Sequence, residues 1–184
     1  MSRLATLYLA AEFHGEIAIE DSPGGHWSRP PAFEDGGGGL VSTVSDYLAF
    51  ASALLADGTY DGKRVLPRPS VTLMTSDQLT PAQKAVSGFT PGYFDHFGWG
   101  FGMSVRTRRT HLGPSVGSYG WNGGYGIIWY NDPTEDMTAI LMNQAEPGGL
   151  RRRFSSTSSR PPTRRSTTDR WRPIHPRRLA EVVR

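Results

Sequence analysis

Two short stretches of this sequence contain residue types whose spacing could support chemistry. The first covers residues 117–126 (GSYGWNGGYG), in which five of the ten residues are glycine. Glycine has no Cβ, so a ligand can approach main-chain N–H groups closely, and a glycine-rich strand is typical of such a contact or of a bulge. The same pattern fits a glycine-rich hairpin with packed aromatic rings. Local features leave both interpretations open.

The second stretch contains a serine in the Gly-x-Ser-x-Gly pattern, Gly113-Pro-Ser115-Val-Gly117. In a nucleophile elbow this pattern joins a strand to a helix, and the strained turn exposes the serine hydroxyl. The residues that follow here, SYGWNGG, are poor helix formers. The one later histidine, His175, lies in an arginine-rich end segment. Ser115 therefore stays a minor candidate for a nucleophile.

The sequence predicts neither a metal site nor a cofactor. It has no cysteine, which excludes disulfides, thiol catalysis and thiolate ligands. Its five histidines show no metal-ligand spacing such as His-x-x-x-His. The four glycines at 36–39 lack the lysine of a phosphate-binding loop. The glycines at 58 and 62, before Lys63, have three residues between them where that loop needs four.

The clearest element around these stretches is a predicted helix that opens at Ser42 or Thr43 and stops at Gly58. A hydroxyl at either opening position can cap the first free N–H groups, and Asp46 suits the positive end of the helix dipole. One apolar face repeats at helical spacing: Tyr47, Phe50, Ala51, Leu54 and Leu55. We also expect a strand or short helical turn over residues 4–9, a strand over 16–20, a helix over 69–76 and a loop over 77–95.

Three apolar runs predict an antiparallel sheet. Residues 97–105 (FGWGFGMSV) alternate aromatic or apolar residues with glycine, as one strand with a nearly bare opposite face would. The glycine-rich stretch with the run after it, and then residues 137–143, supply two more strands around a turn at Asn131-Asp132-Pro133. The expected fold class is α/β of the α+β sandwich type, in which a three-stranded antiparallel meander has flanking helices.

Charge is divided unevenly along the chain. Residues 1–150 hold 9 Lys and Arg against 15 acids, a net charge of −6, and residues 151–184 hold 11 Arg against two acids, a net charge of +9. Hydrophobic periodicity vanishes from Arg151 onward. We expect a partial domain over 1–150 and a disordered or frame-shifted tail over 151–184. A frame shift is considered because codons for the tail, when read one base over, can encode the start of an amphipathic helix. A basic arm that binds nucleic acid is the lower-ranked interpretation.

Several segments, taken in order, resemble the serine β-lactamase and penicillin-recognising family. They are GGGGLVSTVSDYLAF (36–50), GKRVL (62–66), FGWGFG (97–102), YGWNGGYG (119–126), Asp132-Pro133, and a strand that ends LMNQ at 141–144. The resemblance covers about residues 3–146 and is closest to the esterase-like branch, the lactamase-type carboxylesterases. It implies the C-terminal part of the β-lactamase/transpeptidase-like fold.

In that family Ser-x-x-Lys supplies the nucleophile and base, Tyr-x-Asn supplies a proton-transfer group, and a Lys-Thr-Gly strand contacts the substrate. Esterase-like members carry Trp-x-Gly where other members have Lys-Thr-Gly, and Trp121-Asn122-Gly123 matches this variant. The resemblance implies that these three residues bind the substrate and that the Gly124 N–H is the strand's donor to the oxyanion. Without a lysine to pair a penicillin carboxylate, a small ester is favoured over a β-lactam as substrate.

The other two family motifs are missing. Lys63 and Lys84 are the only lysines and neither follows a serine by three positions, and no Tyr-x-Asn occurs. We therefore expect the C-terminal portion of such an enzyme, with a separately encoded N-terminal half as its partner and no activity from this chain alone. A non-enzymatic ligand-binding module of the same fold is the alternative.

Two further expectations concern location. No apolar run approaches the roughly 20 residues of a membrane span, so no membrane partner is expected. The opening MSRLATLYLAA is too weak for a signal peptide, which favours the cytoplasm. A periplasmic or secreted location stays open, because the native N-terminus need not be present in this sequence.

Overall fold

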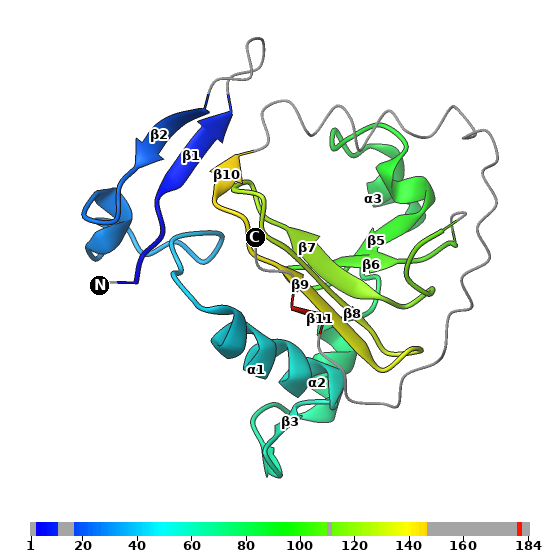
Figure 1. Ribbon diagram of the computed structural model, residues 1–184. Helices are drawn as coiled ribbons and strands as arrows, with labels where there is room; N and C mark the ends of the chain where they lie inside the picture. Colours follow the sequence, from blue (N-terminus) through cyan, green and yellow to red (C-terminus); the bar gives the residue numbers. More distant parts are fainter. Residues whose placement is uncertain (1–2, 11–16, 110–111, 147–179, 182–184) are drawn as a thin grey trace, which may run out of the picture. The chain divides into compact units, whose positions relative to one another are not determined.

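The computed structural model describes residues 3–10, 17–109, 112–146 and 180–181 (Figure 1). The chain divides into two compact units. The first comprises residues 1–41, 124–126 and 143–178, and the second comprises residues 42–123, 127–142 and 179–184. Of the tail expected over residues 151–184, all but residues 180–181 lie outside the described residues.

The first unit contains a three-stranded sheet in the order β10-β1-β2. β1 (Leu7–Ala10) pairs antiparallel with β2 (Ile17–Asp21) and parallel with β10 (Ala145–Glu146). The Asp21 carboxylate, at the end of β2, accepts hydrogen bonds from the His26 N–H (2.8 Å) and the Trp27 N–H (3.0 Å). These two residues open the one-turn helix η1 (His26–Ser28). The strands expected near residues 4–9 and 16–20 are thus present.

In the second unit, α1 (Val44–Leu55) begins where the sequence predicts. Thr43 Oγ1 accepts from the Asp46 N–H (3.1 Å) and donates to the Asp46 carboxylate (2.8 Å), so the cap and the acid support each other. Beyond the helix Gly58 has a φ of 88°, and a Cβ there would lie 2.3 Å from the Leu66 carbonyl oxygen. The hairpin of β3 (Thr59–Tyr60) and β4 (Lys63–Arg64) leads into α2 (Arg68–Met74).

The expectation of a loop over residues 77–95 is wrong at one place, where α3 (Pro81–Ala85) lies. Thr80 Oγ1 accepts from the Gln83 N–H (3.3 Å), and the Gln83 side chain accepts from the Thr80 N–H (2.8 Å). This reciprocal capping box, with Pro81 at the first helical position, starts a helix that has no long apolar face. A one-turn segment, η2 (Tyr93–Asp95), follows.

The second unit is built on a sheet in the order β11-β9-β8-β7-β6-β5. The strands are β5 (Phe97–Trp99), β6 (Ser104–Arg106), β7 (Tyr119–Asn122), β8 (Ile128–Asp132), β9 (Met137–Leu141) and β11 (Ala180–Glu181). β5 to β9 form one antiparallel meander, and β11 pairs parallel with β9. An antiparallel sheet with helices confirms the fold class. Within the described residues, no helix is both long and apolar enough to cross a membrane.

Residues 97–105 form a hairpin and not the single strand that their alternation predicts. The Gly100 N–H donates to the Met103 carbonyl (2.9 Å), and Gly102 has a φ of 82° in the turn between β5 and β6. Gly98 then faces Val105 across the hairpin. Alternating glycine fits a strand and a turn equally well, so the pattern does not indicate where the chain reverses its direction. The meander therefore has five strands instead of three.

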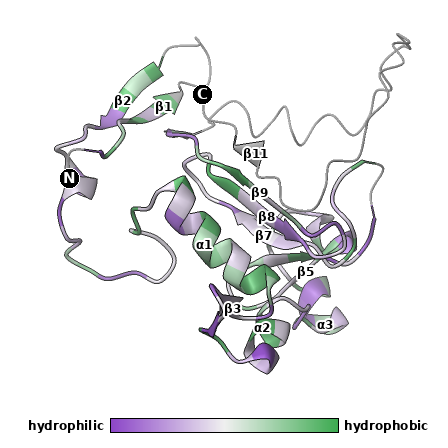
Figure 2. Ribbon diagram, turned by 60° about the horizontal axis from the view of Figure 1, so that its bottom comes forward, coloured by the Kyte–Doolittle hydropathy of each residue, from purple (hydrophilic) through white to green (hydrophobic). Residues whose placement is uncertain are grey.

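The hydrophobic core of the second unit lies between α1 and the strands β8 and β9, on which the helix packs (Figure 2). The rings of Tyr47 and Phe50 in α1 lie 5.5 Å and 5.7 Å from the Trp129 ring of β8. The buried core residues are Ala51, Leu54, Val71, Met103, Val105, Tyr119, Trp129 and Ile140. The apolar face predicted for the helix is therefore the one that packs on the sheet.

The polar side chain of Asn131 is fully buried in this core. Its Nδ2 donates to the Ala51 carbonyl of α1 (2.7 Å) and to the Tyr119 hydroxyl of β7 (3.1 Å). Its Oδ1 accepts from the Thr138 hydroxyl of β9 (2.7 Å) and from the Trp129 indole (3.3 Å). This amide uses its full hydrogen-bonding capacity and joins the helix to three strands.

Replacing Asn131 by alanine should leave several buried partners unsatisfied. We expect Asn131→Ala to lower the free energy of unfolding by about 2–4 kcal/mol, measured by urea denaturation. Asn143→Ala, at an exposed asparagine, is the matched control and should change the free energy by no more than about 0.5 kcal/mol. Equal effects of the two substitutions would contradict the role assigned to Asn131.

Candidate functional site

The residues predicted to bind the substrate lie at the end of β7 and in the turn after it (Figure 1). Trp121, which is half-buried, and Asn122, which is exposed, are the last two residues of the strand. The Gly123 N–H donates to the Ile127 carbonyl (2.7 Å) and closes the hairpin. Gly124 is exposed in the turn, and not on the strand as expected. Among the described residues, the Gly124 N–H has no acceptor.

A close backbone contact explains one glycine of this stretch. A Cβ on Gly120 would lie 1.9 Å from the Trp129 carbonyl oxygen, and backbone atoms of β8 cannot move away as a flexible side chain could. Gly120 is buried and pairs with Tyr130 in the sheet. The hairpin interpretation of residues 117–126 is therefore confirmed, since β7 pairs with β8 and its Gly120 admits the neighbouring backbone. A ligand contact along this stretch stays a prediction.

Trp121 contacts aromatic side chains from two other segments. Its ring lies 4.6 Å from the ring of Trp99 in β5, at an interplanar angle of 78°, and 6.2 Å from the ring of Phe89. Phe89 in turn lies 4.9 Å from the ring of Tyr93. We call Phe89, Tyr93, Trp99 and Trp121 the aromatic cluster. Edge-to-face contacts of this kind are the favoured arrangement of aromatic rings.

Two tyrosines next to these residues are held by hydrogen bonds. The side chain of Asn122 is hydrogen-bonded to the Tyr130 hydroxyl, and the Tyr93 hydroxyl donates to Ser104 Oγ (2.6 Å). Burial raises the pKa of both tyrosines, although these hydrogen bonds and the charge of Arg106 act in the opposite direction. Both hydroxyls are therefore protonated at neutral pH, so they position their neighbours and do not act as bases.

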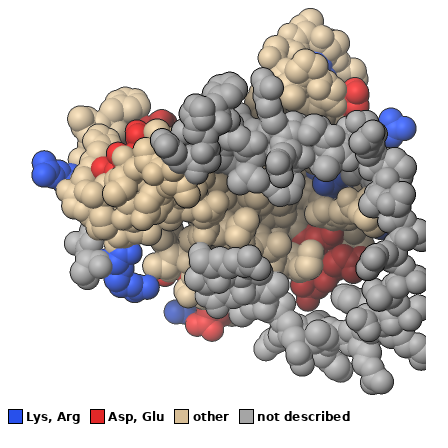
Figure 3. Space-filling view, turned by 45° about the horizontal axis from the view of Figure 1, so that its top comes forward, with Lys and Arg blue, Asp and Glu red and all other residues tan. Residues whose placement is uncertain are grey.

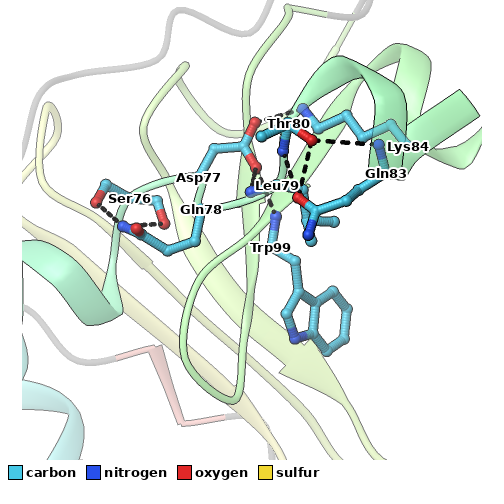
Figure 4. Close-up of polar contacts among 8 residues, drawn as sticks. All are labelled: Ser76, Asp77, Gln78, Leu79, Thr80, Gln83, Lys84 and Trp99. Atoms are coloured by element: carbon cyan, nitrogen blue, oxygen red, sulfur yellow. Dashed lines mark hydrogen bonds and ion pairs between the residues drawn. The ribbon is translucent and has the colours of Figure 1, made fainter.

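Asp77 fixes the backbone of Trp99 (Figure 4). One carboxylate oxygen accepts from the Trp99 N–H (3.1 Å) and from the Leu79 N–H (3.1 Å), and the other pairs with the Lys84 ammonium. Burial alone would raise the pKa of Asp77, but the contacts with Lys84, Trp99 and Leu79 outweigh it and hold the pKa below its ordinary value. Gly98 leaves room for this carboxylate, because a Cβ there would lie 2.1 Å from Asp77 Cγ.

Ser115, the candidate nucleophile, lies in the loop before β7. Its N–H donates to a carboxylate oxygen of Asp132 (2.7 Å), the last residue of β8. A strand follows it, and not the helix that a nucleophile elbow requires. Asn122 pairs with Ile128 at the opposite end of β8, four residues or about 13 Å from Asp132. The structure therefore does not bring Ser115 to the Trp121 segment.

Charge and metal ligands are sparse in the described parts of the chain. In the view of Figure 3, Lys, Arg, Asp and Glu occur in small separate groups, and most of the described surface is uncharged. No cluster of three or more His, Asp or Glu side chains in the described segments could hold a metal ion. The tail expected to carry the basic charge lies almost wholly outside those segments.

Comparison with known proteins identifies similar sequences and folds. The Beta-lactamase family model matches residues 2–156. Protein Rv1367c of Mycobacterium tuberculosis is 39% identical over 150 residues, which are 79% of this chain and 37% of that protein. Acyltransferase calJ of Penicillium decumbens is 27% identical over 141 residues, 69% of this chain and 32% of that protein. The chain thus spans about a third of the length of the curated relatives it matches.

Solved structures show the same fold. A mutant of simvastatin synthase (LovD) from Aspergillus terreus superposes with a TM-score of 0.64 at 22% identity, covering 79% of this chain and 38% of that one. EstCE1, a hydrolase with promiscuous acyltransferase activity, superposes with a TM-score of 0.56 at 20% identity, covering 82% of this chain and 41% of its own. These likenesses agree with the β-lactamase/transpeptidase-like fold implied by the sequence.

The sequence analysis missed the neighbours of Trp121. Phe89 and Tyr93 lie in the region expected to be a plain loop, and Trp99 was assigned to one long strand. A signal for part of this region was present, since Thr80-Pro81 followed by Gln83 is a helix start. No sequence pattern places Phe89 beside β7, because that contact depends on the β5–β6 hairpin.

Removing the Asp77 carboxylate should loosen the edge of the sheet. We expect Asp77→Ala to lower the free energy of unfolding by about 1–3 kcal/mol near neutral pH, because two partly buried N–H groups lose their acceptor. Asp95→Ala, at an exposed acid nearby in the chain, is the control and should have little effect.

The effect of Asp77→Ala should depend on pH. Because the folded pKa of Asp77 lies below its ordinary value of 3.8, its ionised form stabilises the fold above that value. That stabilisation is lost as the pH falls from 3.8 through the lower folded pKa. The stability difference between wild type and Asp77→Ala should shrink over this window, and a difference that grows there would contradict the assignment.

Proposed function

Because this chain belongs to the β-lactamase family, we propose that it provides the substrate-binding strand of a serine acyl-transfer site that acts on esters. The observation that carries the proposal is the end of β7, where Trp121 and Asn122 precede an exposed Gly124 whose N–H has no acceptor among the described residues. A free main-chain N–H after a substrate-contacting strand can stabilise the oxyanion of an acyl-transfer reaction, and such a donor contributes about 3–4 kcal/mol.

The names of similar proteins support acyl transfer over β-lactam hydrolysis. They include an acyltransferase, a simvastatin synthase, and a hydrolase with promiscuous acyltransferase activity. Trp121 stands where a lysine would pair the carboxylate of a penicillin. An indole offers an apolar face and no positive charge, so an uncharged ester suits this position better than a β-lactam acid.

The serine that attacks the ester is not assigned to this chain. Neither Lys63 nor Lys84 has a serine three positions before it. In our proposal the Ser-x-x-Lys motif comes from a separate polypeptide segment, which forms the acyl-enzyme while the β7 segment holds the substrate. The chain by itself binds substrate and does not turn it over.

Two alternatives follow from specific observations. A non-enzymatic ligand-binding module is favoured by the same absence of Ser-x-x-Lys together with an intact aromatic cluster. An esterase that uses Ser115 is favoured by its half-buried position beside Asp132, although no helix follows it. The first alternative predicts binding without turnover under all conditions. The second predicts turnover by this chain alone.

The proposal is tested by supplying the missing motif. The chain alone should not hydrolyse p-nitrophenyl butyrate, and co-expression with a family segment that carries Ser-x-x-Lys should produce turnover. Gly124→Pro removes the N–H and should lower kcat about 10²- to 10³-fold in the co-expressed enzyme. Gly124→Ala is the matched control, since it keeps the N–H and a Cβ there meets nothing within 4 Å.

Three outcomes would count against the proposal. Turnover by the chain alone that Ser115→Ala abolishes would establish the Ser115 esterase instead. Equal kcat values for Gly124→Pro and Gly124→Ala would show that the N–H does not stabilise the oxyanion. Binding of esters with no turnover after co-expression would favour the non-enzymatic module.

A further inference from the structure

The aromatic cluster of Phe89, Tyr93, Trp99 and Trp121 is not part of the hydrophobic core. None of these four side chains belongs to the set of residues buried between α1 and the sheet. Phe89 is 44% exposed, and Trp99 and Trp121 are half-buried. Large aromatic rings that remain partly exposed and in contact with one another offer an apolar surface to a ligand.

The cluster is held in place by contacts on its backbone and its polar ends. The Trp99 N–H donates to the Asp77 carboxylate, and the Trp99 carbonyl accepts from the Gln78 N–H (2.9 Å). The Tyr93 hydroxyl is bound by Ser104, so the polar end of this ring is satisfied inside the protein. A surface that is already ordered loses little conformational entropy when a ligand binds, which favours affinity.

The chemistry of the cluster favours apolar ligands. Its four members are aromatic, and the Asp77 carboxylate behind Trp99 is already neutralised by Lys84. The Trp99 and Trp121 rings meet edge to face, 4.6 Å apart, and Phe89 lies 6.2–6.3 Å from both. An aromatic or long apolar group can add further ring contacts to these side chains, which a small polar group cannot do.

We propose that the aromatic cluster binds the acyl part of the substrate ester and selects a bulky apolar acyl group, with Phe89 as the residue that sets this preference. This inference rests on the proposed function, because it assumes that Trp121 contacts the ester. It extends that function by naming the substrate class, namely uncharged esters of aryl-alkyl or long-chain carboxylic acids. Short acyl groups such as acetyl reach fewer of the four rings.

Binding by the full chain tests the inference without any need for turnover. Methyl 4-phenylbutyrate is the probe, and methyl acetate is the short-chain comparison. The indole N–H signals of Trp99 and Trp121, assigned by single Trp→Phe substitutions, should shift with methyl 4-phenylbutyrate and stay unchanged with methyl acetate at the same concentration. Indole shifts of equal size with both esters, or shifts confined to other tryptophans, would overturn the inference.

A matched pair of variants sharpens this experiment. Phe89→Ala should weaken binding of methyl 4-phenylbutyrate about three- to tenfold, as expected for the loss of one aromatic contact. Phe101→Ala is the control, since Phe101 is 57% exposed in the β5–β6 turn and lies outside the cluster. Equal affinities of the two variants would show that Phe89 does not set the preference. Thermal unfolding of both variants checks that the fold is retained.

The co-expressed enzyme separates this inference from the proposed function. Phe89→Ala should lower kcat/KM for p-nitrophenyl 4-phenylbutyrate by the same three- to tenfold factor, and by more than it lowers kcat/KM for p-nitrophenyl acetate. If wild type and Phe89→Ala both turn over the two esters with equal kcat/KM values, the inference about the acyl group is overturned and the proposed acyl-transfer function stands. Selective binding without turnover would keep the inference and overturn the acyl-transfer role.

Discussion

The buried amide of Asn131 is the interaction on which the second unit most depends. It joins α1 to β7, β8 and β9 through four hydrogen bonds inside the hydrophobic core. A buried amide stabilises a fold only when its donors and acceptors are all paired, so these four partners can adopt only one arrangement around it. The position of β7 relative to the helix, and hence the direction in which its end points, is fixed by this arrangement.

A second constraint acts between β7 and β8. Gly120 lets the Trp129 carbonyl approach to a distance at which no side chain would fit. Residues 121–124 come directly after Gly120 in the chain. The aromatic cluster then forms beside the strand end, because the β5–β6 hairpin presents Trp99 to Trp121 and Asp77 holds Trp99 in place. Packing in the core and geometry at the proposed site are thus linked through a single strand.

Local sequence signals predicted those parts of the fold that depend on local physics. The sequence predicts α1 with a cap at Ser42 or Thr43, of which the structure uses Thr43, and with a stop at Gly58, because capping and helical periodicity depend on neighbouring residues. The β5–β6 hairpin was not predicted, since alternating glycines carry no information on where the chain reverses. Trp121, Asn122 and Gly123 could be proposed as a site only through the family resemblance. The contact of Trp121 with Phe89 joins segments far apart in the sequence, so no local pattern indicates it.

In our proposal this chain presents the Gly124 N–H to the oxyanion of an ester. A crystal structure of the chain co-expressed with a Ser-x-x-Lys segment and treated with a p-nitrophenyl alkylphosphonate tests it most directly, because the bound phosphonyl oxygen mimics the oxyanion. That oxygen should lie about 2.7–3.1 Å from the Gly124 nitrogen, which is the range for an oxyanion hydrogen bond. A phosphonyl oxygen held by other donors, with the Gly124 N–H left facing solvent, would contradict it.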